Sequence, residues 1–122
     1  MRKNLALLVL IPSLILNLFL VGRQRISDPG SMVTGVIDGD TIVLEDNKTR
    51  VRLRFVDAPE TGLCGNKEAT DYLTKLTVNK KVRIEKIIPD QYGRGMGLVY
   101  VDNLLVNKEM VARGLVRYHS DE

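Results

Sequence analysis

The chain is poor in residues that cross-link a fold or bind soft metals. Its 122 residues include one cysteine (Cys64), one histidine (His119) and no tryptophan. A lone cysteine cannot form an intramolecular disulfide, and one cysteine with one histidine cannot build a zinc-type cluster. A folded domain must therefore rely on its apolar core, and a metal site must use oxygen ligands.

Acidic residues are missing before Asp28, and a long apolar run is found there instead. Arg2 and Lys3 precede this nearly uninterrupted run, which extends from Leu5 to Val21. Residues 1–25 are typical of a signal peptide or a hydrophobic membrane-anchor helix, and residues 26–31 of a linker. The lack of a small-residue cleavage site slightly favours an anchor, and a buried core helix is a third reading. We expect residues 32–122 to form a domain outside the cytoplasmic membrane, anchored or secreted.

The positive net charge belongs to the leading segment and not to the domain. Four of the 18 basic residues precede Ile26, whereas all 15 acidic residues follow it. The domain thus carries 14 basic and 15 acidic residues, a net charge of −1. Attraction for a polyanion must come from local arginine placement and bound cations, since bulk charge does not provide it.

The apolar pattern of the domain predicts a small barrel with helices. Alternating or β-prone segments are separated by turn residues, and two segments have helical spacing. The expected strands are 32–37, 40–44, 50–56, 81–88, 98–101 and 104–106, and the expected helices are 66–79 and 107–113. We expect Asn66 and Asn107 to cap these helices. A five-stranded OB-fold, with a helix between its third and fourth strands, fits this order best.

Carboxylates in two neighbouring motifs suggest a site for a hard cation. Asp38 and Gly39 are explained by hairpin-turn chemistry. Asp40 follows that turn, and Asp57 ends the third expected strand. Two carboxylates brought together repel each other unless a cation lies between them, and oxygen ligands suit Ca²⁺ or Mg²⁺. Glu60 follows Pro59 and is a candidate general base for activating water.

Two arginines are spaced to bind a phosphate near these carboxylates. Arg52 lies within the strand, and strict alternation places it on the face opposite to Asp57, so a bend near Val56 is required for the two to meet. Arg94 lies between two glycines, which permit unusual dihedrals and close approach of the backbone. Tyr92 is a candidate for stacking on a base. Arginines and a metal with a free carboxylate suit phosphodiester hydrolysis.

Three motifs resemble the staphylococcal-nuclease-like (thermonuclease) family from about Val33 to Tyr118. They are DGDTIVL at 38–44, RLRFVDAPE at 52–60 and DQYGRGMGLVY at 90–100. The resemblance implies an OB-fold of the staphylococcal nuclease type and Ca²⁺-dependent cleavage of DNA and RNA that leaves 3′-phosphorylated products. It assigns calcium to Asp40 and Asp57, the scissile phosphate to Arg52 and Arg94, and water attack to Glu60.

The chain also departs from thermonuclease. Ala58 and Gln91 replace a threonine and a commonly basic residue of that enzyme, and its C-terminal helix has no counterpart in the printed sequence. We therefore predict a monomeric nuclease with little sequence specificity and a preference for single strands, which also contacts the membrane if its leading segment stays uncleaved. The alternatives are an OB-fold module that binds nucleic acid or protein without cutting, and a tethered structural domain.

Overall fold

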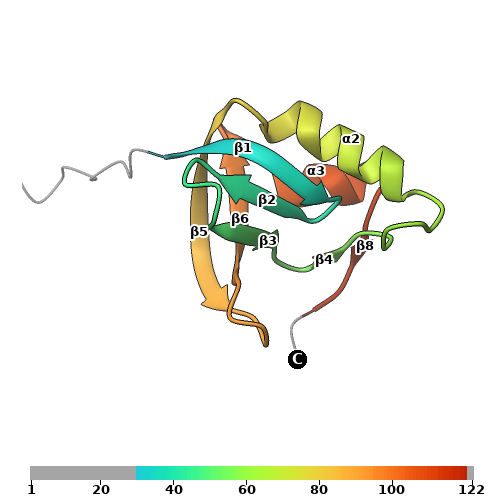
Figure 1. The fold of residues 1–122 in the computed structure, drawn as a ribbon. Coiled ribbons are helices and arrows are strands. Elements are labelled where there is room, and N and C mark those ends of the chain that lie inside the picture. Colours follow the sequence, from blue (N-terminus) through green and yellow to red (C-terminus); the bar gives the residue numbers. More distant parts are fainter. Residues whose placement is uncertain (1–29, 121–122) are drawn as a thin grey trace, which may run out of the picture.

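The computed structural model describes residues 30–120 (Figure 1). The predicted leader at 1–25 and most of the predicted linker lie outside the described residues. Within residues 30–120, neither helix has the length and apolar character needed to cross a membrane. The elements are β1 (Ser31–Asp38), β2 (Thr41–Leu44), β3 (Arg50–Leu53), β4 (Val56–Asp57), α2 (Asn66–Thr77), β5 (Lys81–Pro89), β6 (Gly95–Val101), β7 (Leu104–Leu105), α3 (Val106–Ala112) and β8 (Arg117–Tyr118).

Five strands close into a barrel. β1 pairs antiparallel with both β2 and β5, β2 with β3, and β5 with β6. A parallel pairing of β3 with β6, which aligns Val51 with Gly95, completes the ring. α2 connects the third barrel strand, β3, to the fourth, β5, and packs on β1. This is the predicted OB-fold, and the prediction is confirmed.

The core draws apolar side chains from the strands and from both helices. Ile42, Leu53 and Val99 from the barrel are fully buried, as are Leu73 of α2 and Met110 of α3. Each such burial contributes about 1.5–3 kcal/mol relative to an exposed side chain. The two helices thus cover the same side of the barrel in Figure 1 and are held to it by apolar contacts.

The predicted strand at 50–56 is broken in the structure. Phe55 adopts a positive φ of 67°, which lies outside the strand region and separates β3 from β4. The break reverses the alternation, so Val56 is 1% exposed, whereas Phe55 is only half-buried, against Tyr118 and beneath Arg54. The continuous strand was therefore wrong, but the bend that the sequence required near Val56 is confirmed.

Neither predicted helix cap is used as expected. The residue before α2 is Gly65 with a φ of 87°, and Asn66 instead donates from Nδ2 to the carbonyl of Pro59 at 2.8 Å. Val106, expected in a strand, begins α3, so Asn107 lies inside the helix and is buried. The prediction of capping asparagines was wrong because both side chains bind main-chain groups of neighbouring segments.

Buried Asn107 connects α3 to the barrel and to the bend. Its Oδ1 accepts a hydrogen bond from the main-chain N–H of Val99 at 2.9 Å. Its Nδ2 donates to the carbonyls of Arg54, at 2.9 Å, and Gly97, at 3.1 Å. The amide therefore binds three main-chain groups, of which the Gly97 carbonyl also accepts from the N–H of Arg54 at 2.9 Å, and it fixes the chain beside Phe55.

Candidate active site

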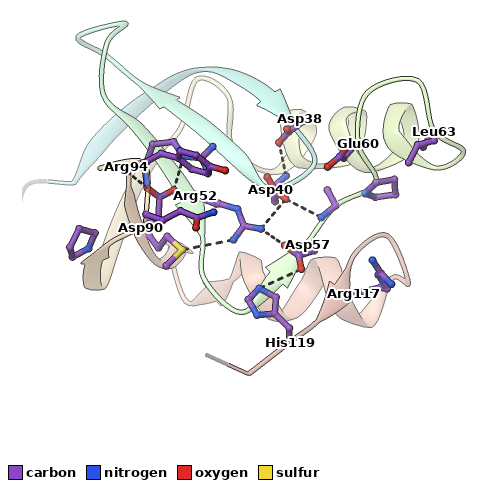
Figure 2. A pocket seen from close by; sticks show the side chains of 16 residues that line it. Asp38, Asp40, Arg52, Asp57, Glu60, Leu63, Asp90, Arg94, Arg117 and His119 are labelled. Carbon is purple, nitrogen blue, oxygen red and sulfur yellow. Dashed lines mark hydrogen bonds and ion pairs between the residues drawn. The ribbon is translucent and has the colours of Figure 1, made fainter. Parts of the chain in front are cut away.

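All six predicted site residues line one open pocket at the end of the barrel (Figure 2). The pocket has a volume of about 850 Å³. Its wall is formed by the turn between β1 and β2, by β3 and β4, by the loop that follows β4 and by the turn before β6. The predicted residues in its wall are Asp40, Arg52, Asp57, Glu60, Tyr92 and Arg94. Residues separated by more than 50 positions are therefore gathered around one space, as the motif order suggested.

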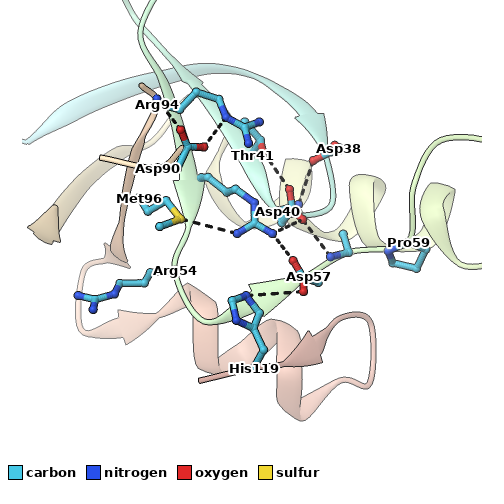
Figure 3. A network of polar contacts seen from close by, with 12 residues as sticks. Asp38, Asp40, Thr41, Arg54, Asp57, Pro59, Asp90, Arg94, Met96 and His119 are labelled. Atoms are coloured by element: carbon cyan, nitrogen blue, oxygen red, sulfur yellow. Dashed lines mark hydrogen bonds and ion pairs between the residues drawn. The ribbon is translucent and has the colours of Figure 1, made fainter. Parts of the chain in front are cut away.

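Arg52 lies between the two predicted metal carboxylates (Figure 2), and Figure 3 shows Asp40 and Asp57 within the same network of polar contacts. Its Nη2 forms an ion pair with Oδ1 of Asp57 and lies 3.6 Å from Oδ2 of Asp40. The side chains of Arg52 and Asp40 are only 15% and 10% exposed, so these charges interact in a partly desolvated setting. The guanidinium occupies the position where the two carboxylates converge, and it neutralises part of their mutual repulsion.

Main-chain and hydroxyl donors hold Asp40 in place. Its Oδ2 accepts a hydrogen bond from the N–H of Ala58 at 3.0 Å, and its Oδ1 accepts one from the hydroxyl of Thr41 at 2.9 Å. The Ala58 contact also ties the start of β2 to the segment just after β4. The carboxylate is thus oriented before any ligand arrives, which lowers the cost of binding one.

Asp38 adds a further carboxyl beside the Asp40–Asp57 pair. Its Oδ1 accepts a hydrogen bond from the main-chain N–H of Asp40 at 3.3 Å, as turn chemistry predicts. Its side chain also lines the pocket, a position that the turn interpretation did not foresee. Burial, together with the adjacent Asp40 carboxylate, raises the pKa of Asp38 to about 6. The acidic side chains that line the pocket therefore outnumber its arginines.

The donor set fits a hard divalent cation that keeps part of its water shell. Asp40 and Asp57 offer carboxylate oxygens on the wall of the pocket, and Asp38 adds another carboxyl beside them. Among residues 30–120, no group of three or more Asp, Glu, His or Cys side chains is arranged to hold a metal. Asp40 and Asp57 would hold such a cation only together with main-chain oxygens or waters as further ligands.

Arg94 is fixed by a tight turn at the opposite end of the pocket. Oδ2 of Asp90 accepts from Nε of Arg94 at 2.6 Å, and Oδ1 accepts from the main-chain N–H groups of Arg94 and Tyr92 at 2.8 and 2.9 Å. Burial alone would raise the pKa of Asp90, but the hydrogen bonds from Arg94 and Tyr92, together with the charge of Arg94, lower that pKa. Gly93 closes the turn with a φ of 76°.

The same turn exposes an aromatic face. Tyr92 is 74% exposed, and its ring centroid lies 5.3 Å from Cζ of Arg94. Because Nε of Arg94 is committed to Asp90, the outer guanidinium nitrogens remain directed to the pocket as the donors for an oxyanion. A guanidinium beside an exposed aromatic ring can bind a phosphate and the base attached to it.

Glu60 is exposed at the start of the loop between β4 and α2. Its main-chain carbonyl accepts from the N–H of Leu63 at 2.9 Å, which forms a turn after Pro59. Its carboxylate makes no hydrogen bond or ion pair with any of residues 30–120. It faces the pocket in Figure 2, so a proton acceptor is available there without first breaking an ion pair.

β8 brings two pocket residues that sequence reasoning missed. It pairs antiparallel with β4, which aligns Asp57 with Arg117, and the N–H of His119 continues the ladder to the carbonyl of Phe55 at 2.9 Å. Nε2 of His119 lies 3.6 Å from Oδ2 of Asp57. Arg117 and His119 lie two positions apart in the sequence, which is typical of residues on one face of a strand. This spacing does not identify β4 as the partner strand.

Comparison with known proteins places this arrangement in a family. Residues 50–122 match the family model described as staphylococcal nuclease homologue. This region contains Arg52, Asp57, Glu60, Tyr92 and Arg94.

Three relatives illustrate the similarity. The thermonuclease of Staphylococcus hyicus is 36% identical over 106 residues, which cover 79% of this chain and 63% of the relative. An uncharacterized endonuclease of Escherichia coli O157:H7 is 38% identical, with 72% and 60% covered. The probable staphylococcal-like nuclease CAN1 of Oryza sativa subsp. japonica is 30% identical, with 80% and 29% covered. The chain thus spans less than two thirds of each of these relatives, and its fold and matched sequence show that it belongs to the staphylococcal nuclease family.

Proposed function

We propose that this protein hydrolyses phosphodiester bonds in DNA and RNA with little sequence specificity, depends on Ca²⁺, and leaves 3′-phosphorylated products. The observation that carries the proposal is the convergence of Arg52, Glu60 and Arg94 on the pocket that contains the Asp40–Asp57 pair. The names of the relatives, thermonuclease and endonuclease, support the same class of reaction.

The two arginines bind the reacting phosphate from different directions. Arg94 extends its outer nitrogens from the turn at one end, and Arg52 approaches from β3. A guanidinium has five N–H donors, so Arg52 can keep one bond to Asp57 while it donates to a phosphate oxygen. Their charges stabilise the extra negative charge of the transition state, and each such contact is worth about 3 kcal/mol.

Glu60 removes the proton from the attacking water. The water oxygen bonds to phosphorus, the bond from phosphorus to the 5′-oxygen breaks, and the leaving oxygen takes a proton from solvent. Calcium, held by Asp40 and Asp57, would supply further charge neutralisation at the phosphate. General-base catalysis of this kind accelerates a reaction by about 10²–10⁴-fold.

The open pocket favours single strands as substrate. Tyr92 presents an exposed ring beside Arg94, and an unpaired base can stack on such a ring without base-specific hydrogen bonds. We also propose export of the domain, secreted or anchored by the leading segment, and action as a monomer, because one chain supplies all six site residues. The mass of the exported protein and its sedimentation behaviour test these two points.

The decisive experiment incubates the full-length protein with single-stranded DNA or RNA, first with calcium and then with a chelator. Glu60→Gln and Arg94→Ala variants run alongside, and Glu45→Gln serves as a control because Glu45 is exposed and lies outside the pocket. We expect calcium-dependent cutting that both site variants lose and the control keeps. The products should accept a 5′-phosphate from a kinase and resist 3′-extension until a phosphatase treats them. Binding without cutting by the wild type would instead establish a non-catalytic OB-fold module.

A further inference from the structure

A second hollow continues the pocket beyond β4. It has a volume of about 300 Å³ and shares five lining residues with the first pocket, namely Asp57, Ala58, Pro59, Leu63 and Arg117. Leu63 and Arg117 lie at the end of the pocket away from Arg94 in Figure 2. The two hollows therefore form one groove that crosses the segment from Asp57 to Pro59.

Arg117 lines this groove, and no carboxylate among residues 30–120 forms an ion pair with it. Its pairing with Asp57 across the β4–β8 ladder places both side chains on the same face. The Asp57 carboxylate is nevertheless bound by Arg52, with His119 on its other oxygen. Arg52 and Arg94 are held by carboxylates, whereas exposed Arg117 has no ion pair within the described part of the chain.

Without Arg117, the charges at this end of the pocket would repel nucleic acid. Asp57 and Glu60 both carry carboxylates there, and a strand that leaves the pocket over Pro59 must pass them. A phosphate beside two carboxylates is unfavourable in a partly desolvated groove unless a cation accompanies it. Arg117 is the cation that both hollows share, and Leu63, 62% exposed, gives the opposite border an apolar surface for a base.

We propose that Arg117 binds the phosphate next to the scissile one as a polynucleotide strand crosses from the first hollow into the second. The neighbouring base lies against Leu63. The site then recognises two consecutive phosphates and prefers a polymer to a diester that has one phosphate. This assignment rests on the proposed nuclease function and adds a specificity-determining contact to it.

The test compares two substrates in calcium: a single-stranded oligonucleotide and a nucleoside nitrophenyl phosphodiester that carries a single phosphate. Variants are Arg117→Ala, Arg117→Lys and the control Arg50→Ala. Arg50 is also exposed, and its loss changes the net charge equally, but it lies outside both hollows of the groove. Melting curves should be the same for all variants, because these side chains project into solvent.

We expect Arg117→Ala to lower kcat/KM on the oligonucleotide by about five- to tenfold, and to leave the single-phosphate substrate within about twofold. The slope of log kcat/KM against log salt concentration should fall by about 0.7 on the oligonucleotide. Lysine should recover part of the loss, and Arg50→Ala should preserve the ratio between the two substrates. If Arg117→Ala changes kcat/KM equally on both substrates, or on neither, the proposed role of Arg117 is wrong, but the proposed nuclease function is unaffected. A wild-type protein that cuts neither substrate overturns the subsite and the proposed function together.

Discussion

Replacing Asp38 by asparagine should stabilise the protein at neutral and alkaline pH. Burial and the adjacent Asp40 raise the pKa of the Asp38 carboxyl from 3.8 to about 6. Between those pH values the folded protein binds a proton that the unfolded chain releases, so the free energy of unfolding falls as pH rises through this window. Asparagine keeps the Oδ1 acceptor for the N–H of Asp40 and carries no charge at any pH.

The expected stabilisation follows from the difference between the two pKa values of Asp38. About two pKa units correspond to about 3 kcal/mol for a fully buried group. Asp38 is half-exposed, and solvent screening reduces the expected gain of Asp38→Asn to about 1 kcal/mol at about pH 8. For a domain of this size that gain raises Tm by about 4–8 °C. At about pH 3 both side chains are neutral, and the gain should vanish.

Urea unfolding in the presence of a chelator, at both pH values, measures this difference. Asp46→Asn is the matched control of opposite sign, because hydrogen bonds from Thr49 and Lys48 lower the pKa of Asp46. That variant should lose stability at high pH and match the wild type at low pH. An Asp38→Asn protein that is no more stable than the wild type at high pH, or more stable by the same amount at both pH values, would refute the raised pKa of Asp38.

Three further substitutions probe the barrel and the site. Asn107→Leu removes the partner of three main-chain groups and should lower the free energy of unfolding by about 3 kcal/mol in urea, whereas Asn103→Ala, in an exposed turn, should change it by less than about 0.5. Gly39→Ala would place Cβ 2.5 Å from Cβ of Ala69 in α2 and should cost about 1–3 kcal/mol in thermal unfolding; an unchanged Tm would contradict that contact. Glu60→Gln should reduce cleavage by about 10²–10⁴-fold with Tm unchanged, and full activity would exclude the glutamate as the base.

The barrel was predictable because its signals are local. Alternating apolar residues, turn pairs such as Asp38-Gly39, and one helical segment between the third and fourth barrel strands were enough to identify the OB-fold. The first and last residues of individual strands and helices were harder to predict. Val106 has strand propensity but is fully buried as the first residue of α3, where tertiary packing decides its conformation.

The gathering of the six predicted residues around one pocket could be predicted from the sequence, and their geometry only in part. Alternation alone separates Arg52 from Asp57, and the need to unite them correctly located a bend. The sequence did not identify Phe55 as the residue with positive φ, because an aromatic residue rarely adopts that conformation without tertiary support. His119 and Arg117 were missed for another reason. Their place depends on which strand β8 joins, and a two-residue strand carries too little pattern to specify a partner.

The support for the Phe55 bend explains why the last part of the domain matters to a site encoded near its middle. The carbonyl of Arg54 accepts a hydrogen bond from Asn107 of α3, and the carbonyl of Phe55 accepts one from the N–H of His119. Both acceptors flank the strained residue, whose conformation costs about 1–3 kcal/mol and persists only where surrounding contacts compensate for it. If those contacts were lost, the chain could relax toward a continuous strand and turn the Asp57 carboxylate away from Arg52 and Asp40. The position of a proposed metal ligand is therefore a property of the whole barrel, maintained by α3 and β8 as much as by its own strand.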